Sequence, residues 1–232
     1  MRVLVIDDSP FICKAVAKAL EGTEHEVIDT AMNGQIGVEK YLALQPDIIT
    51  LDVTMPVMDG LEAAAQIEKL ETGTPIVAMT ANIMSGEMEI YKSSGIPDYI
   101  SKPFTSQELW RCLMKYLTPA GQSAAEKNTQ FDEIDLDLEF KKVLQRHFLE
   151  NNQNKYEEII DAIKADDIKL AHRIAHTLKG NAAQLGRTSL RMAASDVERQ
   201  LKGGENLATE DQLKTLKAEL SDFLQELSLI YS

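Results

Sequence analysis

The sequence predicts a doubly wound α/β domain with a five-stranded parallel sheet, followed by an all-α up-and-down helical bundle. Three observations lead to this prediction. In the first half of the 232 residues, short apolar runs alternate with segments of helical periodicity. Beyond about residue 131 the helical periodicity continues, but no further strand pattern is found. Between the two patterns lies a short stretch of small and polar residues that is typical of a linker.

The first half contains five strand–helix repeats. The expected strands are residues 3–6, 26–30, 48–51, 76–79 and 99–100. The expected helices are residues 11–20, 34–44, 61–70, 85–93 and 106–117. This alternation implies parallel strands joined by right-handed crossovers, with helices on both faces of the sheet. In such sheets the functional groups gather at the carboxyl ends of the strands.

The second half is predicted to be helical. Asp166 and Asp167 are an expected N-cap, while Gly186 and the Gly203-Gly204 pair are expected helix terminators. Apolar residues recur at helical spacing in residues 136–163, 168–185, 190–201 and 213–230. We therefore expect an α/β domain at residues 1–118, a linker at 119–130 and a helical bundle at 131–232.

Composition and charge restrict the classes of function. The net charge of −13 disfavours nucleic-acid binding, which needs a concentrated basic surface. No basic amphipathic tract suggests membrane binding, and no apolar run approaches the ~20 residues of a spanning helix. Cys13 and Cys112 match no metal-ligand spacing, so we expect both to be reduced, partly buried thiols. Met1 lies directly before the first strand without a signal peptide, which favours a free-standing cytoplasmic protein with no direct membrane insertion.

Five polar residues stand where predicted strands end. Asp7 and Asp8 follow the first strand, Asp52 the third, Thr80 the fourth and Lys102 the fifth. Carboxylates that converge at one sheet edge raise one another's pKa values unless a cation is present, and Mg2+ suits such a half-open oxygen site. An ionised Asp52 could then attack a phosphorus atom while Lys102 neutralises charge on the equatorial oxygens. The Thr80 hydroxyl could turn to bond the new phosphoryl group.

Each of these signals has an ordinary alternative when taken alone. An Asp-Asp pair is often a helix cap, and a lone threonine or Lys-Pro usually belongs to a turn or loop. Their joint occurrence at successive strand ends favours a reaction site. A Mg-dependent phosphatase with an aspartyl nucleophile is a competing function. Such enzymes carry Asp-x-Asp after the first strand, whereas the candidate nucleophile here follows the third.

The helix predicted at residues 168–185 carries a histidine beside a lysine and a glycine. Its core stripe is expected to consist of Ile168, Ala171, Ala175, Leu178, Ala182 and Leu185. The flank beside it holds Lys169, His172, His176, Lys179, Gly180 and Ala183. His176 is therefore expected to be exposed or nearly so, Lys179 could steady a phosphoryl group, and Gly180 leaves room for a partner. His172 and His176 also have metal-ligand spacing, but the sequence offers no third ligand beside them.

The first half resembles the receiver domain of two-component response regulators over residues 2–117. The resemblance is carried by VIDDSP (residues 5–10), LDVTMPVMDG (51–60), MTAN (79–82) and DYISKPF (98–104). It implies the flavodoxin-like form of the sheet and makes Asp52 the phospho-acceptor. Asp8 and Asp52 would bind Mg2+ directly, with the Thr54 main-chain carbonyl as a further ligand and Asp7 acting through water.

The same resemblance assigns the other residues of the pocket. Thr80 and Tyr99 would be the paired switch residues, and Lys102 the phosphate-binding lysine. Pro97 replaces the acidic residue that is usual before Asp98, which affects none of these roles. The motifs at residues 79–82 and 98–104 are most similar in sequence to those of receivers found in hybrid sensor kinases.

The second half resembles histidine-containing phosphotransfer (HPt) domains from about residue 131 to 231. AHTLKGNA at residues 175–182 carries the resemblance. It makes His176 the phospho-site and Lys179 its neighbour. The resemblance assigns no role to His172, but its place on the same flank as His176 leads us to expect both Gly180 and His172 at the docking surface.

Together the two halves predict a phosphorelay intermediate that works between an upstream sensor histidine kinase and a downstream response regulator. No ATP-binding domain is recognisable, so no stand-alone enzyme is expected. A receiver switch with a passive helical docking domain is the remaining alternative. Whether Asp52 and His176 exchange a phosphoryl group within one molecule stays open.

Overall fold

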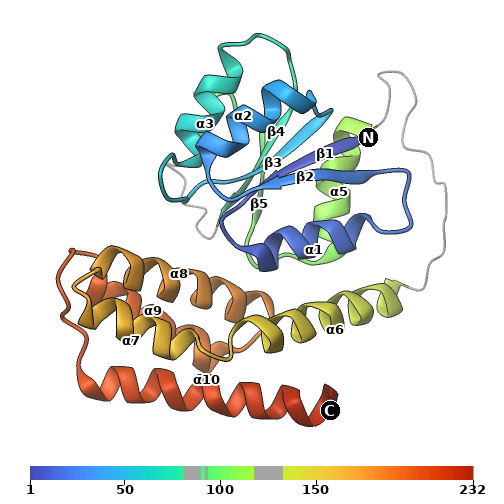
Figure 1. Ribbon diagram of the computed structural model, residues 1–232. Helices are drawn as coiled ribbons and strands as arrows, with labels where there is room; N and C mark the ends of the chain where they lie inside the picture. Colours follow the sequence, from blue (N-terminus) through green and yellow to red (C-terminus); the bar gives the residue numbers. More distant parts are fainter. Residues whose placement is uncertain (81–89, 92–93, 118–132, 232) are drawn as a thin grey trace. The chain divides into compact units, whose positions relative to one another are not determined.

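The computed structural model describes residues 1–80, 90–91, 94–117 and 133–231 (Figure 1). The chain divides into two compact units, Met1–Phe140 and Lys141–Ser232. The linker predicted at residues 119–130 lies outside the described residues, as does most of the helix predicted at 85–93. Of that helix, Ile90 and Tyr91 are described, and both are helical.

The first unit contains a five-stranded parallel sheet with the strand order β2-β1-β3-β4-β5, which confirms the predicted flavodoxin-like fold. The strands are β1 (Arg2–Ile6), β2 (Glu26–Ala31), β3 (Ile48–Asp52), β4 (Ile76–Thr80) and β5 (Asp98–Ser101). The helices are α1 (Pro10–Leu20), α2 (Gly34–Leu44), α3 (Gly60–Glu68) and α5 (Ser106–Leu117).

Helices cover both faces of this sheet. α1 packs against α5 on one face, and α2 packs against α3 on the other (Figure 1). Every residue of β3 and β4 is buried, because each strand in the middle of the sheet meets a helical layer on either side. Since β1 and β3 are neighbours, the residues at their carboxyl ends lie next to each other. This adjacency brings together side chains that are 45 residues apart in the chain, such as Asp7 and Asp52.

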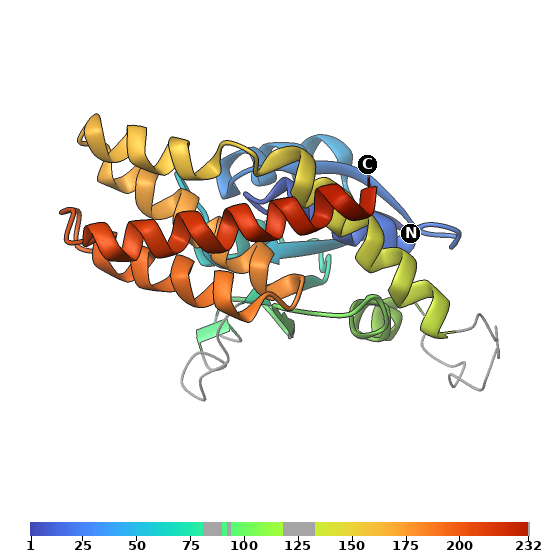
Figure 2. The same cartoon turned by 90° about the horizontal axis from the view of Figure 1, so that it is seen from below.

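The second unit is helical in its described residues. α6 (Glu133–Asn151) begins in the first unit and continues into the second. The other helices of the second unit are α7 (Lys155–Lys164), α8 (Ile168–Gln184), α9 (Thr188–Leu201) and α10 (Glu210–Tyr231). α8 packs against both α7 and α9, and α10 packs against α9 (Figure 2). Among the described helices, none combines the length and the apolar character that crossing a membrane requires.

The prediction of one continuous helical segment at residues 136–163 is wrong, because two helices, α6 and α7, occupy this part of the chain. Asn152 lies at the break and is buried. Its side-chain Nδ2 donates to the carbonyl oxygen of Phe148 at 2.8 Å, and its backbone N–H donates to the same oxygen at 3.1 Å. Asparagine side chains compete with the backbone in this way and favour helix ends over helix interiors. Apolar spacing continues across the break, so periodicity alone could not reveal it.

The predicted ends and core face of α8 are confirmed. Asp167 is the N-cap, and its side chain accepts a hydrogen bond from the Leu170 N–H at 3.0 Å. Gly186 follows the helix with a φ of +69°, a conformation that glycine adopts without steric cost. The predicted core stripe is buried at all six positions, namely Ile168, Ala171, Ala175, Leu178, Ala182 and Leu185.

Candidate functional site

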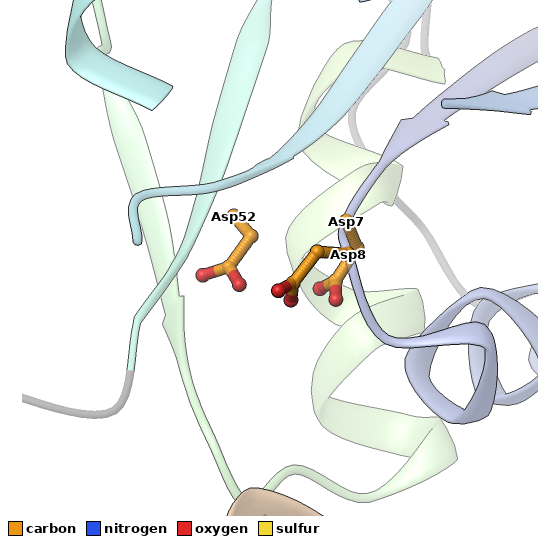
Figure 3. Close-up of side chains that lie close together, drawn as sticks. All are labelled: Asp7, Asp8 and Asp52. Carbon is orange, nitrogen blue, oxygen red and sulfur yellow. The ribbon is translucent and has the colours of Figure 1, made fainter. Parts of the chain in front are cut away.

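Three carboxylates meet at the carboxyl edge of the sheet (Figure 3). Asp7 and Asp8 follow β1 and Asp52 ends β3, and each offers an oxygen within 4.8 Å of the others'. Asp7 and Asp52 are buried, while Asp8 is half-buried. The predicted convergence of these residues is therefore present. A cluster of hard oxygen donors that is partly open to solvent fits a magnesium ion.

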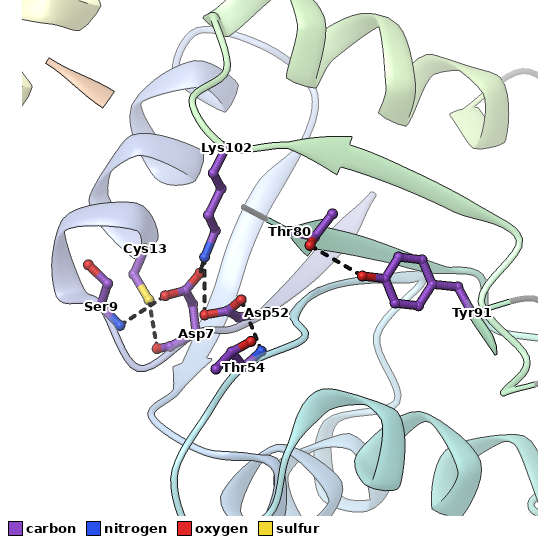
Figure 4. A network of polar contacts seen from close by, with 8 residues as sticks. All are labelled: Asp7, Ser9, Cys13, Asp52, Thr54, Thr80, Tyr91 and Lys102. Carbon is purple, nitrogen blue, oxygen red and sulfur yellow. Dashed lines mark hydrogen bonds and ion pairs between the residues drawn. The ribbon is translucent and has the colours of Figure 1, made fainter. Parts of the chain in front are cut away.

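Lys102 and Thr54 hold the Asp52 carboxylate from two sides (Figure 4). The Lys102 ammonium lies 3.1 Å from Asp52 Oδ2 and 2.7 Å from Asp7 Oδ2. The Thr54 backbone N–H donates to Asp52 Oδ1 at 3.3 Å. Asp7 also accepts the Ser9 N–H at 2.9 Å, so both of its oxygens have partners within the protein. The arrangement aims a cation at the carboxylate that is the candidate nucleophile.

The electrostatics of the pocket are dominated by burial and by an excess of carboxylates. Burial raises the pKa of Asp7 to about 7, with Asp52 adding to the rise and Lys102 opposing it. Burial alone would lower the pKa of Lys102, but the carboxylates of Asp7 and Asp52 raise it above its usual range. Three carboxylates and one ammonium group leave the pocket with an excess of negative charge. A divalent cation would offset this excess.

Gly60 fixes the loop that follows Asp52. A Cβ atom at Gly60 would lie 2.1 Å from the main-chain oxygen of Asp52 and 2.8 Å from Cα of Val53. Only glycine allows α3 to begin this close to the end of β3. Asp59 caps the same helix, because its side chain accepts the Glu62 N–H at 2.8 Å. The close approach therefore fixes how near the start of α3 lies to the end of β3.

Thr80 ends β4 and is buried, as expected for a residue at this edge. Its hydroxyl accepts a hydrogen bond from the hydroxyl of Tyr91 at 3.2 Å (Figure 4). Sequence reasoning named Tyr99 as the partner of Thr80 in switching and did not identify Tyr91. Tyr99 is half-buried and packs against the core cluster that includes Tyr91. The helical spacing of the segment carries no sign that Tyr91 reaches Thr80.

The candidate histidine of the second unit lies on α8 and contacts α9. His176 is 28% exposed, so it is only partly accessible. Its Nδ1 atom lies 2.5 Å from Oε1 of Glu198. Lys179 donates to Oε2 of the same carboxylate at 2.7 Å. Glu198 therefore links the histidine and the lysine. Sequence reasoning missed it, because it stands on another helix 22 residues from His176.

One oxygen of the Glu198 carboxylate contacts His176, and the other accepts from Lys179. Burial alone would raise the pKa of Glu198, but hydrogen bonds from His176 and Lys179 lower it to about 2. His172 stacks near His176 with ring centroids 6.5 Å apart. Burial lowers the pKa of His172, while the Glu198 carboxylate opposes that shift. Among the described residues, Asp7, Asp8 and Asp52 form the only group of three or more potential metal-ligating side chains whose donor atoms lie within 4.8 Å of one another.

Gly180 lies inside α8, one residue after Lys179. A Cβ atom at this position would meet nothing within 4 Å, and its φ is not in the left-handed region. Glycine in a helix interior costs about 1 kcal/mol relative to alanine. Within the described part of the chain, no contact requires glycine here.

Two family models match the chain. The response regulator receiver domain matches residues 3–113, and the Hpt domain matches residues 143–226. Chemotaxis protein CheY of Treponema pallidum is 39% identical over 113 residues, which are 47% of this chain and 76% of the relative. CheY of Listeria monocytogenes is 35% identical over 115 residues, which are 50% of this chain and 97% of the relative.

A third relative aligns with almost the entire chain. The signal transduction histidine-protein kinase BarA of Escherichia coli is 27% identical over 255 aligned positions, covering 99% of this chain and 27% of the kinase. The chain thus spans about a quarter of that protein's length. Among solved structures, a chain of the CheX-CheY-BeF3-Mg complex from Borrelia burgdorferi aligns with a TM-score of 0.49 and 27% identity, over 51% of this chain and 90% of that one.

Proposed function

The chain belongs to the response regulator receiver family through residues 3–113 and carries an Hpt domain at residues 143–226, and from this we propose that it is a phosphorelay intermediate of two-component signalling with Asp52 and His176 as its phospho-sites. The observation that carries the proposal is the presence in one chain of two complementary groups. Asp52 is an anionic oxygen nucleophile beside a lysine, and His176 is a partly exposed imidazole beside a carboxylate.

At the first site, Asp52 accepts the phosphoryl group. One of its oxygens attacks the phosphorus of a phosphohistidine, an oxygen–phosphorus bond forms, and the nitrogen–phosphorus bond breaks with its electron pair returning to the imidazole. Lys102 lies 3.1 Å from the attacking carboxylate, where its ammonium can neutralise charge that develops on the phosphoryl oxygens. The Thr80 hydroxyl then turns to bond the phosphoryl group, with Tyr99 as its partner in the switch.

The carboxylate cluster supports magnesium as the cofactor. Asp8 and Asp52 would hold the ion together with the Thr54 main-chain carbonyl, and Asp7 would act through water. When bound, magnesium offsets the excess negative charge of the pocket and of the phosphoryl oxygens.

At the second site, Glu198 prepares His176. A carboxylate accepts hydrogen bonds, so the contact at Nδ1 favours the tautomer with hydrogen on Nδ1 and the lone pair on Nε2. Attack by Nε2 on the phosphorus of an aspartyl phosphate forms a nitrogen–phosphorus bond and returns the aspartate as a carboxylate. The ring then carries a positive charge, which Glu198 stabilises, while Lys179 lies beside the same carboxylate. This setting favours an active site over a passive docking bundle.

The partners that suit these groups are an upstream sensor histidine kinase and a downstream response regulator, with His172 and Gly180 at the docking surface. The proposed place of action is the cytoplasm. No role as a stand-alone enzyme is proposed, because the chemistry needs only one donor and one acceptor of a phosphoryl group.

The experiment that tests the proposal is phosphorylation of the full chain by a phosphorylated histidine kinase in the presence of Mg2+. Wild-type protein should acquire both base-labile aspartyl phosphate and acid-labile histidine phosphate. Asp52→Asn should lose the aspartyl phosphate, and His176→Gln should lose the histidine phosphate. His172→Gln is the matched control on the same flank of α8, and it should keep at least part of the label. Label that persists on the bundle of His176→Gln, or on the receiver of Asp52→Asn, would contradict the assignment.

A further inference from the structure

The hydrogen bond between Tyr91 and Thr80 joins the reaction pocket to the core of the first unit. Tyr91 is 5% exposed and belongs to the core cluster that also contains Ala78 and Ile96. Its carbonyl oxygen accepts the backbone N–H groups of Ser94 and Ile96, at 3.1 and 3.0 Å. The residue is therefore held by its ring and its backbone, and only its hydroxyl reaches the pocket edge.

The hydroxyl of Tyr91 engages the residue that must respond to phosphorylation. Thr80 is 5% exposed, and its side-chain oxygen accepts the Tyr91 O–H at 3.2 Å. In Figure 4 the Thr80 hydroxyl is joined to Tyr91, whereas Asp52 is joined to Lys102 and Thr54. Turning the Thr80 side chain about its Cα–Cβ bond towards a phosphoryl group on Asp52 moves its oxygen away from the Tyr91 hydroxyl.

We propose that Tyr91 is a positioning residue that holds Thr80 in its unphosphorylated orientation, so that phosphorylation of Asp52 must break the Tyr91–Thr80 hydrogen bond. The inference rests on the proposed function of Asp52. Because Tyr91 is buried, its released hydroxyl leaves a polar group in the core and disturbs the packing around the Tyr91 ring. Phosphorylation is thereby coupled, through the Tyr91–Thr80 hydrogen bond, to the core packing around Tyr91.

The core offers a matched control. Tyr41 is also buried and belongs to the same core cluster, but its hydroxyl bonds to the hydroxyl groups of Thr72 and Thr74, and none of these residues is among those that form the pocket. Tyr91→Phe and Tyr41→Phe each remove one hydroxyl from a buried tyrosine and keep the ring. Only Tyr91→Phe should change how the pocket receives a phosphoryl group.

The test is calorimetric titration of the full chain with beryllofluoride in the presence of Mg2+, as a stable mimic of the aspartyl phosphate. Tyr91→Phe should bind roughly 2- to 10-fold more tightly than wild type, the range expected when one opposing hydrogen bond is removed. Tyr41→Phe should bind as wild type does. A merely structural role for Tyr91 predicts weaker binding, because damage to the packing cannot improve the pocket.

The outcomes distinguish a failure of the role proposed for Tyr91 from a failure of the proposed function of the chain. Equal or weaker binding by Tyr91→Phe, with normal binding by wild type, overturns the role of Tyr91 and leaves the proposed function intact. Absence of binding by wild type overturns the proposed function and this inference with it. A second measurement needs no variant: beryllofluoride should shift the ring Cζ resonance of Tyr91 in wild-type protein but not that of Tyr41. An unchanged Tyr91 resonance would also overturn the inference.

Discussion

The Nδ1 atom of His176 lies 2.5 Å from Oε1 of Glu198, a contact that joins α8 to α9 at the candidate phospho-site of the bundle. The carboxylate is mostly buried, with 13% of its side chain exposed, whereas the histidine is 28% exposed. The contact therefore orients the imidazole from its inner side and leaves its outer edge towards solvent. Glu198 should therefore affect both the reactivity of His176 and the stability of the bundle.

Replacing Glu198 with glutamine should slow phosphorylation of His176. The amide can donate to Nδ1 and favour the wrong tautomer, and it lacks the charge that stabilises the phosphorylated ring. We expect a loss on the order of 10- to 100-fold in the rate of transfer from a phosphorylated receiver, smaller than for a fully enclosed triad because His176 is partly exposed. Glu226→Gln is the control, since Glu226 pairs with Arg187 and not with His176. Equal rates for Glu198→Gln and wild type would contradict this role.

The same carboxylate should make the bundle sensitive to acid. The folded-state pKa of Glu198 is lowered to about 2, below its usual value near 4.3. Its stabilising contribution is thus fully present above about pH 4.3 and is lost as the pH falls towards 2. Amide hydrogen exchange of α8 and α9 should show the wild-type bundle weakening over this window, while Glu198→Gln weakens less. An identical pH profile for the two proteins would count against the pairing.

Gly180→Ala should stabilise the bundle and impair phosphotransfer. Alanine is favoured over glycine inside a helix by about 1 kcal/mol, and the added Cβ meets no atom within 4 Å. The methyl group would instead stand where we propose that a partner domain approaches His176. Urea denaturation and the rate of transfer to a receiver measure the two effects. Gly186→Ala should have the opposite effect on stability, because Gly186 has a positive φ. If Gly180→Ala transferred at the wild-type rate, Gly180 would have no part in docking.

Lys102→Met should slow labelling of Asp52 by acetyl phosphate roughly 100-fold, because it removes the cation 3.1 Å from the reacting carboxylate. The apolar chain keeps the volume of the lysine but leaves the buried Asp7 without its ammonium partner. Incorporation of phosphate over time is the measurement. Lys115→Met, which loses an ion pair with Asp98 on the surface, should label normally. Normal labelling of Lys102→Met would exclude a role for its charge.

Val57→Gly should stabilise the first unit by about 1 kcal/mol. Val57 has a φ of +71°, which is sterically unfavourable for a β-branched residue, and its side chain is 84% exposed, so little packing is lost. Urea unfolding followed by the fluorescence of Trp110 gives the free energy. Val57→Ala keeps a Cβ atom and therefore most of the strain. An equal gain for alanine and glycine would show that backbone strain is not the cause.

The sequence by itself determined the local elements. All five strands lie within one residue of their predicted bounds, and the core face of α8 is the predicted one. These features follow from the period of apolar residues, which repeats every two residues in a strand and every 3.6 in a helix. The meeting of Asp7, Asp8 and Asp52 was also predictable, because parallel strands deliver their carboxyl ends to one edge.

Only the tertiary structure decided which side chains from separate elements meet. Glu198 reaches His176 across a helix–helix contact, and Tyr91 reaches Thr80 from a segment outside the sheet. The end of α6 at Asn151 likewise depends on the local bonding of Asn152, not on apolar spacing. Periodicity records which face of an element is buried, but the angle and offset at which two elements pack determine the pairing of their side chains. Those quantities arise from the combined shape of many residues, so no local stretch of sequence contains them.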